Sequence, residues 1–243
     1  MLSKSQLKYI QSLDQKKYRD EESVFIAEGP KLVQEILQSR NAELKNLYAL
    51  KRWILENKEL VPTANVTEIE ETELERISNL KTPNNVLAVF KKFQIKEPVV
   101  RNKISLILDA VRDPGNLGTI IRIADWFAID EIICSDDCAD VYNSKVVQAT
   151  MGSIARVNIF YTDLEAWLKE QPVRIYGALL EGKDITKMNA IKEGLVIIGN
   201  ESNGIRRELV PYVNERITIP RKGNAESLNA AIATGIILSH LIS

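Results

Sequence analysis

The chain has 243 residues, of which 45% are hydrophobic and 27% are charged, and its formal net charge is −1. This composition is ordinary for globular proteins, so it argues against a disordered or fibrous chain, and the length allows two modest domains. A net charge near zero supplies no general attraction for phosphate, so any contact with nucleic acid must come from a local patch.

The N-terminal segment is such a patch. Its cationic residues before Asp20 are Lys4, Lys8, Lys16, Lys17 and Arg19, and only Asp14 opposes them. The segment is either a solvated basic terminus or a contact for phosphate. It lacks the apolar core of a signal peptide, and no apolar run in the chain approaches the roughly 20 residues that cross a bilayer. We therefore expect a cytoplasmic protein without a membrane partner.

Residues 1 to 95 are predicted to form a small α/β domain. Pro30 suits the first turn of a helix, and Thr72 with Glu75 makes a capping box for a second helix. The strand candidates of this part are Leu47 to Leu50 and Val86 to Phe90. A charged stretch with a proline follows, so we place a linker at residues 96 to 103.

Apolar strands alternate with amphipathic helices from residue 104 to residue 243. The strand candidates are Ile104 to Leu108, Glu131 to Cys134, Val157 to Tyr161, Arg174 to Leu180, Leu195 to Ile198 and Arg216 to Ile219. The helix candidates are Leu117 to Phe127, Ser144 to Met151, one opened by a Thr162/Glu165 capping box, and Leu228 to Leu241. Such alternation predicts an α/β fold with a mostly parallel sheet, whose ligands bind beyond the carboxyl ends of the strands.

The chain has two cysteines, Cys134 and Cys138, and one histidine, His240. No second Cys/His pair lies at zinc-ligand spacing, so we predict neither a disulfide framework nor a metal site. The cysteines are interpreted as packing thiols in a reducing compartment.

An irregular segment follows the first strand of the second half and leads into a helix. Asn116 can cap this helix, and Arg122 lies on its second turn. A Pro-Gly turn before an ordinary capped helix is one interpretation, and a ligand site at the strand end is the other. The dinucleotide-binding pattern G-x-G-x-x-G is absent, which argues against a nucleotide-dependent dehydrogenase.

A second irregular segment, Gly199 to Gly204, follows the strand candidate Leu195 to Ile198. Gly199 would let a ligand approach the backbone closely, and Glu201 puts a carboxylate at the strand end. A plain turn rich in Gly, Asn and Ser is the alternative.

A third irregular segment, Pro220 to Asn229, opens the last helix of the chain. Ser227 and Asn229 flank Leu228 there, so two polar side chains and free backbone N–H groups lie at one helix start. Helix capping alone would explain one of the two polar residues.

Taken together, the three segments resemble the three motifs of the SpoU (TrmH-type) family of SPOUT RNA ribose 2′-O-methyltransferases. The matching stretches are Asn116 to Arg122, Gly199 to Gly204, and Ile219-Pro220 through Ser227-Leu228-Asn229. Their order and spacing agree, and the resemblance covers residues 104 to 243. The first 95 residues resemble the small ribosomal-protein-like RNA-binding domain that often precedes this catalytic domain.

The resemblance implies a C-terminal trefoil-knot domain, S-adenosylmethionine as methyl donor, and a homodimer with the site near the interface. It implies an RNA partner, with ribosomal RNA preferred and transfer RNA as an alternative. The residues that it would place at the cofactor are Gly199, Ile219 and Leu228, with Leu179 and Leu180 as possible additions.

The resemblance also implies a set of catalytic residues. These are Asn116, Arg122, Glu201, Ser227 and Asn229. A guanidinium has a pKa of roughly 12 or more and normally keeps its proton. We therefore interpret Arg122 as a stabiliser of the developing alkoxide rather than as the base. Glu201 as the base is the rival assignment. A non-catalytic RNA-binding or ribosome assembly factor would share the fold and the dimer, but it would neither bind nor consume the methyl donor.

Overall fold

The computed structural model describes residues 2–62, 64–200 and 202–242, and the chain divides into two compact units. The first unit contains the chain up to Gln94 together with Asp140–Ala155. The second contains Ile95–Ala139 and the chain from Arg156 onward. Residues 140–155 therefore pack with the first unit although both of their neighbouring segments belong to the second.

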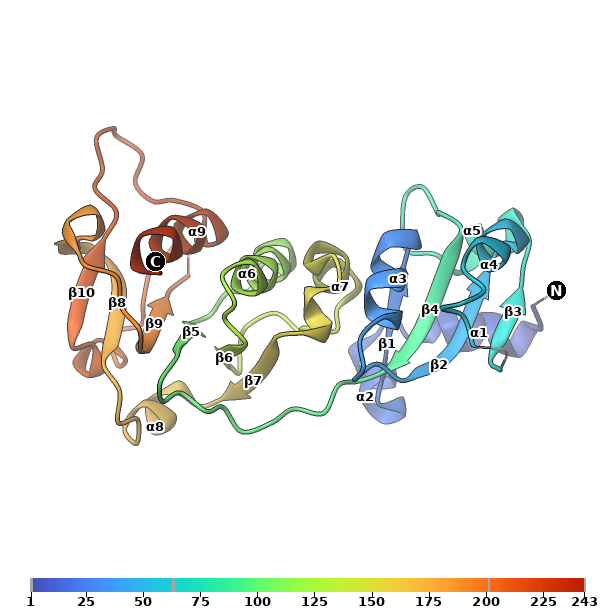
Figure 1. The fold of residues 1–243 in the computed structure, drawn as a ribbon, viewed down its shortest axis with the longest axis horizontal. Coiled ribbons are helices and arrows are strands. Elements are labelled where there is room, and N and C mark those ends of the chain that lie inside the picture. The colour runs from blue at the N-terminus through green and yellow to red at the C-terminus, as the bar shows by residue number, and fades with distance from the viewer. Residues whose placement is uncertain (1, 63, 201, 243) are drawn as a thin grey trace. The chain divides into compact units, whose positions relative to one another are not determined.

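A four-stranded mixed sheet forms the centre of the first unit (Figure 1). Its strands, in spatial order, are β1 (Val24–Glu28), β4 (Val86–Lys91), β2 (Leu44–Ala49) and β3 (Val66–Glu68). β4 pairs antiparallel with β1 and β2, and β2 pairs parallel with β3. All five residues of β1 are buried, as expected of a strand covered on both faces.

The helices of the first unit are short. They are α1 (Lys4–Ser12), α2 (Lys16–Glu22), α3 (Pro30–Leu37), α4 (Lys51–Glu56), α5 (Glu71–Ile77), α7 (Ser144–Thr150) and the 3₁₀ turn η1 (Ser153–Ala155). Pro30 stands in the first turn of α3, as predicted. The capping box predicted at Thr72 and Glu75 is wrong. The extended residue before α5 is Glu70, which pairs with Glu73 in the box, because the helix begins two residues earlier than its apolar pattern indicated.

Arg19 is not part of a basic surface, which corrects the sequence interpretation. The residue is 3% exposed, and its guanidinium donates to the Leu13 carbonyl at 2.9 Å and to the Asp140 carboxylate at 2.7 Å. Nearby, the ring of Tyr142 lies 5.1 Å from that of Phe25. These contacts hold the start of residues 140–155 to the first unit. The lysines Lys4, Lys8, Lys16 and Lys17 remain exposed.

A six-stranded sheet forms the centre of the second unit, and all of its neighbouring strands run parallel. Its order is β10-β8-β9-β5-β6-β7. The strands are β5 (Ile104–Leu108), β6 (Glu131–Ser135), β7 (Asn158–Thr162), β8 (Ile175–Asp184), β9 (Gly194–Ile198) and β10 (Glu215–Thr218). The predicted parallel α/β fold is thus confirmed, and each strand candidate from residue 104 onward overlaps an observed strand.

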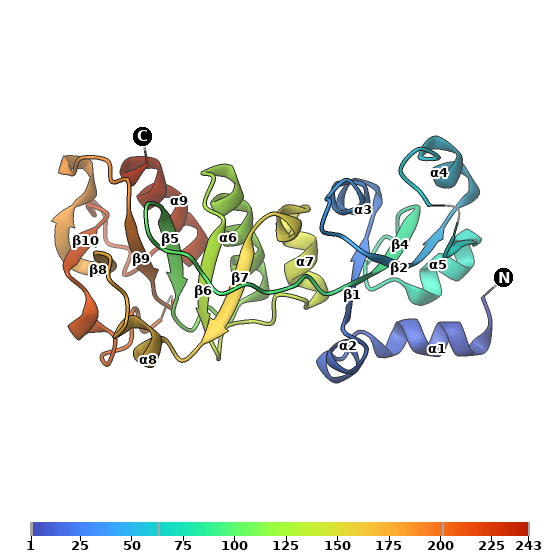
Figure 2. The same cartoon turned by 60° about the horizontal axis from the view of Figure 1, so that its bottom comes forward.

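The helices of this unit cover both faces of the sheet (Figure 2). They are α6 (Pro114–Trp126), α8 (Leu164–Leu168) and α9 (Ala230–Leu241), with 3₁₀ turns η2 (Ile185–Lys187) and η3 (Val210–Tyr212). α6 and α9 pack side by side. Leu164 and Leu168 of α8 join the core cluster of Ile107 and Ile197, which alternate with residues on the opposite face of their strands.

Two predicted helix starts in this unit are wrong by a few residues. Asp113, not Asn116, caps α6, and its carboxylate accepts from the backbone N–H of Asn116 at 2.8 Å. Pro114 suits the first helical position, so the helix begins before the first apolar residue of its pattern. Asp163 caps α8 in place of the box predicted at Thr162 and Glu165. None of the described helices is both long and apolar enough to cross a bilayer. The trefoil knot implied by the family resemblance stays a prediction.

Candidate active site

A cleft of about 1170 Å³ opens beside the middle of β8 and the ends of β9 and β10, where the irregular segments begin. The structure brings all of the residues predicted to bind a cofactor into its lining: Leu179, Leu180, Gly199, Ile219 and Leu228. Two of them belong to β8, one follows β9, one follows β10, and one precedes α9. Segments almost fifty residues apart along the chain therefore share one wall.

The mouth of this cleft exposes apolar side chains. Leu180 is 77% exposed and Leu228 is 45% exposed, beside the half-buried Leu179 and Ile219. The cationic residues Arg221 and Lys222 also line it. Open apolar surface beside a few polar groups is typical of sites for organic ligands. The cleft can therefore hold an apolar group of a ligand beside its cationic residues.

The loop after β9 is tightly closed on itself. Asn200 and Gly204 exchange both backbone hydrogen bonds, at 3.1 and 2.8 Å. Gly204 has φ +66°, a conformation that favours glycine. A Cβ atom on Gly199 would lie 2.2 Å from the Gly204 carbonyl carbon, so only glycine fits at this position. From the sequence we expected glycine at position 199 because a ligand approaches the backbone there. In the structure, a side chain at this position would already collide with the loop itself.

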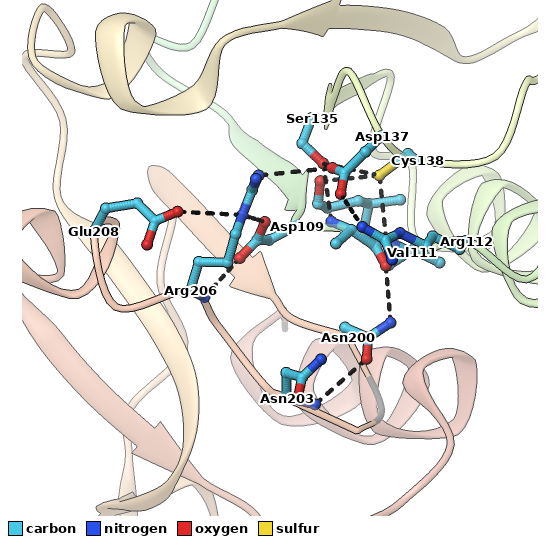
Figure 3. A network of polar contacts seen from close by, with 12 residues as sticks. Asp109, Val111, Arg112, Ser135, Asp137, Cys138, Asn200, Asn203, Arg206 and Glu208 are labelled. Carbon is cyan, nitrogen blue, oxygen red and sulfur yellow. Dashed lines mark hydrogen bonds and ion pairs between the residues drawn. The ribbon is translucent and has the colours of Figure 1, made fainter.

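This loop is fastened to the loop after β5 at two points (Figure 3). The Asn200 side-chain amide donates to the Ala110 carbonyl at 2.9 Å. Arg206 donates to the Asp109 carboxylate through its backbone N–H at 2.7 Å and through Nε at 2.6 Å. Asp109 is completely buried, so this charge-assisted pair is shielded from solvent on the carboxylate side. The two loops are therefore positioned as one body.

A second set of contacts supports the loop after β5 from β6 (Figure 3). Ala110 has φ +55°, and its backbone N–H donates to Ser135 Oγ at 2.9 Å. The Ser135 hydroxyl donates to Asp137 at 2.7 Å, and Arg112 pairs with the same carboxylate at 2.6 Å. The left-handed backbone at Ala110 is unusual for a residue with a side chain and is held by these bonds.

Cys138 takes part in the same network, although the sequence suggested only a packing role. Its sulfur accepts from the Val111 backbone N–H at 3.3 Å. A hydrogen bond from Cys134, together with those from Ser135 and Val111, lowers the pKa of Cys138 to about 7. The hydrogen bond with Cys138, followed by burial, raises the pKa of Cys134.

Sequence analysis missed Asp109, Asp137 and Arg206. A signal existed for the first of them, because a carboxylate directly after a buried parallel strand lies where ligands bind. Nothing local pointed to Arg206, because its partner Asp109 is 97 residues away.

The predicted catalytic residues fall into separate groups. The Asn229 amide donates to Asn116 Oδ1 at 2.7 Å, which joins the starts of α6 and α9. Ser227 lines the cleft. Arg122 is exposed on α6 outside the cleft lining, and within residues 2–62, 64–200 and 202–242 its side chain has no hydrogen-bond or ion-pair partner. Glu201 lies outside the described residues.

The described residues show no group of three or more potential metal ligands.

Comparisons with known proteins point to one family. Residues 103–239 match the model of the SpoU rRNA Methylase family, and residues 4–88 match that of the MRM3-like substrate binding domain. Over 238 residues the chain is 31% identical to the 23S rRNA (guanosine(2553)-2′-O)-methyltransferase RlmP of Bacillus subtilis. That alignment covers 94% of this chain and 92% of the relative.

Solved structures agree with this assignment. A TrmH-family protein from Porphyromonas gingivalis is 38% identical, with a TM-score of 0.88 over 100% of this chain and 98% of that one. An AdoMet-bound rRNA methyltransferase from Sinorhizobium meliloti is 32% identical, with a TM-score of 0.87 over 99% of this chain and 96% of that one.

Proposed function

Because this chain belongs to the SpoU rRNA methylase family, we propose that it is a methyltransferase that uses S-adenosylmethionine to modify a ribose 2′-hydroxyl in RNA. The observation that supports this most directly is the cleft that gathers residues of β8, β9, β10 and the start of α9. Ribosomal RNA is the proposed substrate. Support for it comes from the relative RlmP, which is named for 23S rRNA and aligns with the chain over nearly its full length.

The cleft suits S-adenosylmethionine. Gly199 leaves the backbone bare, and Leu180, Ile219 and Leu228 offer apolar surface for an adenine ring. Homology supports the same cofactor, since the Sinorhizobium meliloti structure is AdoMet-bound. When bound, the cofactor supplies a methyl group on a positively charged sulfonium.

Arg122 is the proposed stabiliser of the reacting ribose oxygen. A 2′-hydroxyl is a poor nucleophile, so transfer requires alignment and stabilisation of the negative charge that develops on the oxygen. Arginine offers a planar, charged set of N–H donors, and the side chain of Arg122 is exposed. The proton of the hydroxyl then leaves to phosphate or water. Asn116 and Asn229 hold the starts of α6 and α9 together, and Ser227 acts from the lining of the cleft. Glu201 orients Arg122 or the substrate.

A homodimer is proposed through the exposed face of α6 and α9. Trp126 of α6 is 85% exposed and Ile232 of α9 is 56% exposed. Large apolar side chains on two adjacent helices favour a partner surface. Arg122 lies one turn from Trp126 on α6, so covering this face would place Arg122 at the subunit interface.

The test of the function is transfer of labelled methyl groups from S-adenosylmethionine to total RNA from cells that lack this protein, followed by mapping of the labelled ribose. Label in 23S rRNA is the expected result, and label in transfer RNA would instead support the alternative substrate. If the protein binds RNA but transfers no label, it is an RNA-binding or assembly factor and the proposal is wrong.

The role of Arg122 is tested by single-turnover kinetics. Replacing Arg122 by Ala should lower the rate of transfer by about 10²–10³-fold, the usual loss for one charge-stabilising donor, while S-adenosylmethionine affinity stays unchanged. Arg122→Lys should recover part of the rate because it keeps the charge but not the planar fork. A titrating base in the pH–rate profile that disappears in Glu201→Gln would assign proton removal to Glu201.

A further inference from the structure

A second hollow, of about 300 Å³, lies within the first compact unit. One wall is formed by β1 and the loop after α5, and the other is formed by α7. The residues that determine its chemistry are Ile26, Glu28, Leu80, Lys145, Gln148 and Ala149. This hollow shares no residue with the cleft of the candidate active site.

The α7 wall is firmly held. Asn143 caps the helix and accepts from the Lys145 N–H at 2.9 Å. The buried pair of Arg19 and Asp140 and the ring contact between Tyr142 and Phe25 anchor the segment that precedes it. α7 also packs directly on β1. The hollow is therefore a fixed feature of this unit.

Glu28 supplies a buried carboxylate to the hollow. The residue is 4% exposed, and its oxygens accept from the Ser78 hydroxyl and from the Asn79 backbone N–H at 3.0 Å. No cation pairs with it in the described part of the chain. Burial raises the pKa of Glu28 despite these two donors. A carboxylate has about four acceptor positions, so this one can accept further N–H groups.

Three other polar side chains meet at the same hollow. These are the amides of Asn79 and Gln148 and the ammonium of Lys145. Across the described residues, none of the three side chains has a hydrogen-bond or ion-pair partner. Ile26, Leu80 and Ala149 provide apolar surface between them. A few polar groups around a small, partly apolar hollow are the usual composition of a ligand site.

We propose that this hollow binds one unpaired nucleotide of the RNA substrate, with its base between the apolar residues and its phosphate at Lys145. The proposal rests on the proposed function for the presence of RNA. A volume of about 300 Å³ suits one nucleotide and is too small for a duplex. Protein readers of single strands take up splayed-out bases in this way and bond their Watson–Crick edges.

The chemistry of the hollow also selects the base. Glu28 offers only acceptors when ionised, and the amides of Asn79 and Gln148 offer both donors and acceptors. Guanine presents adjacent N–H donors beside a carbonyl acceptor, whereas uracil presents a single N–H. The hollow therefore prefers guanine to uracil. Because α7 lies outside residues 4–88, the site is composite and is not contained in the matched substrate-binding domain alone.

The experiment measures binding of short single-stranded RNAs to the full chain by fluorescence anisotropy. S-adenosylhomocysteine is present at saturation so that the cleft of the second unit is in the same state in every measurement. The probes are an oligouridylate, the same strand with one central guanosine, and the same strand with one abasic position. We expect the guanosine strand to bind about tenfold more tightly than the other two, equivalent to about 1.4 kcal/mol.

Three variants separate the contributions. Gln148→Ala should remove the preference for guanosine. Lys145→Ala should weaken the binding of all three strands. It should also lower the slope of log affinity against log salt concentration by about one. Lys58→Ala is the matched control, because Lys58 is exposed and does not line the hollow, and it should leave both quantities unchanged. Circular dichroism verifies that each variant is folded.

Equal binding of the three strands, or equal effects of Lys145→Ala and Lys58→Ala, would overturn the proposal. A lower salt slope in Lys145→Ala, without preference for any of the three strands, would mean that Lys145 contacts only the RNA backbone. Methyl transfer to total RNA by the same preparation distinguishes the two hypotheses. If transfer occurs and base preference is absent, only the nucleotide site is wrong, whereas absence of both transfer and RNA binding removes the proposed function as well.

Discussion

The carboxylate of Asp109 accepts two hydrogen bonds from Arg206, one from the backbone and one from the guanidinium. Since Asp109 directly follows β5 and Arg206 lies in the loop after β9, this pair joins the loop that leads to the first motif to the loop that holds the second. The guanidinium reaches solvent, with the side chain 38% exposed, while the carboxylate is fully buried. The geometry of the candidate active site thus depends on a contact outside the motifs themselves.

Removing the Arg206 side chain should destabilise the protein. Arg206→Ala leaves Asp109 buried with only the backbone donor, so we expect the free energy of unfolding to fall by about 2 kcal/mol, a value reduced from that of a fully buried pair because Arg206 is partly exposed. Arg207→Ala is the control, and its effect should stay within about 0.5 kcal/mol because Arg207 is exposed. Urea denaturation measures both. Equal effects of the two variants would show that the pair contributes no stability.

The contact between Asn229 and Asn116 can be separated from the helix cap that Asn229 also provides. Asn229 Oδ1 accepts from the N–H groups of Ala231 and Ile232, at 3.0 and 3.2 Å. Asn229→Ala should lower the free energy of unfolding by about 1 kcal/mol through loss of the cap. Asn229→Asp should retain the cap but lose the amide that reaches Asn116.

A double-mutant cycle of Asn229→Asp with Asn116→Ala measures the side-chain bond itself. We expect a coupling energy of about 0.5–1 kcal/mol, as for an ordinary neutral hydrogen bond. Urea denaturation of the four proteins supplies the values, and a coupling energy of zero would mean that the contact is energetically unimportant.

The glycine at position 199 should be essential for the cleft. In Gly199→Ala the new Cβ would lie 2.2 Å from the Gly204 carbonyl carbon and 2.4 Å from its oxygen, so the loop must move. We expect the affinity for S-adenosylmethionine to fall by at least about tenfold, or about 1.4 kcal/mol, in isothermal titration calorimetry. Gly235→Ala is the matched change, because Gly235 does not line the cleft and its Cβ would meet only Ile123 Cδ1, at an ordinary contact distance of 3.7 Å. Similar affinities in the two variants would contradict this account of the loop.

The thiol of Cys138 should titrate near neutral pH. Its alkylation by iodoacetamide should increase with a midpoint at about pH 7, and Cys134 should not react, since its pKa is raised. Because the hydrogen bond from Cys134 is the largest cause, Cys134→Ala should move the midpoint upward toward the ordinary value of 9.0. Mass spectrometry of protein labelled at several pH values measures this, and an unchanged midpoint would exclude Cys134 as the cause.

The same shift has a consequence for stability. An acid whose pKa is lower in the folded state stabilises the fold above its unfolded pKa, here 9.0, and this contribution is lost as the pH falls through about 7. The difference in free energy of unfolding between wild type and Cys138→Ser should therefore grow between pH 7 and pH 9. A constant difference over this range would contradict the sign of the shift.

Helix starts show the limit of local patterns. Near α5, α6 and α8 several polar residues within three positions could act as caps, and the residues that do so are Glu70, Asp113 and Asp163. Apolar periodicity locates the buried face of a helix but not the residue at which its backbone becomes helical. The strands were predicted more closely, as for Ile104–Leu108, because a buried parallel strand is an uninterrupted apolar run.

The amino-acid sequence by itself determined the parallel α/β architecture, the family resemblance and the residues that line the cleft, because these follow from periodicity and from motifs a few residues long. Only the tertiary structure decided that Arg19 is buried against Asp140, that Arg206 binds Asp109, and that α7 completes a hollow beside Glu28. Each of these relationships joins residues about 100 positions apart. Their physical cause is the burial of charge, which is stable only where the folded chain supplies a partner or a donor, and no local pattern specifies where that partner lies.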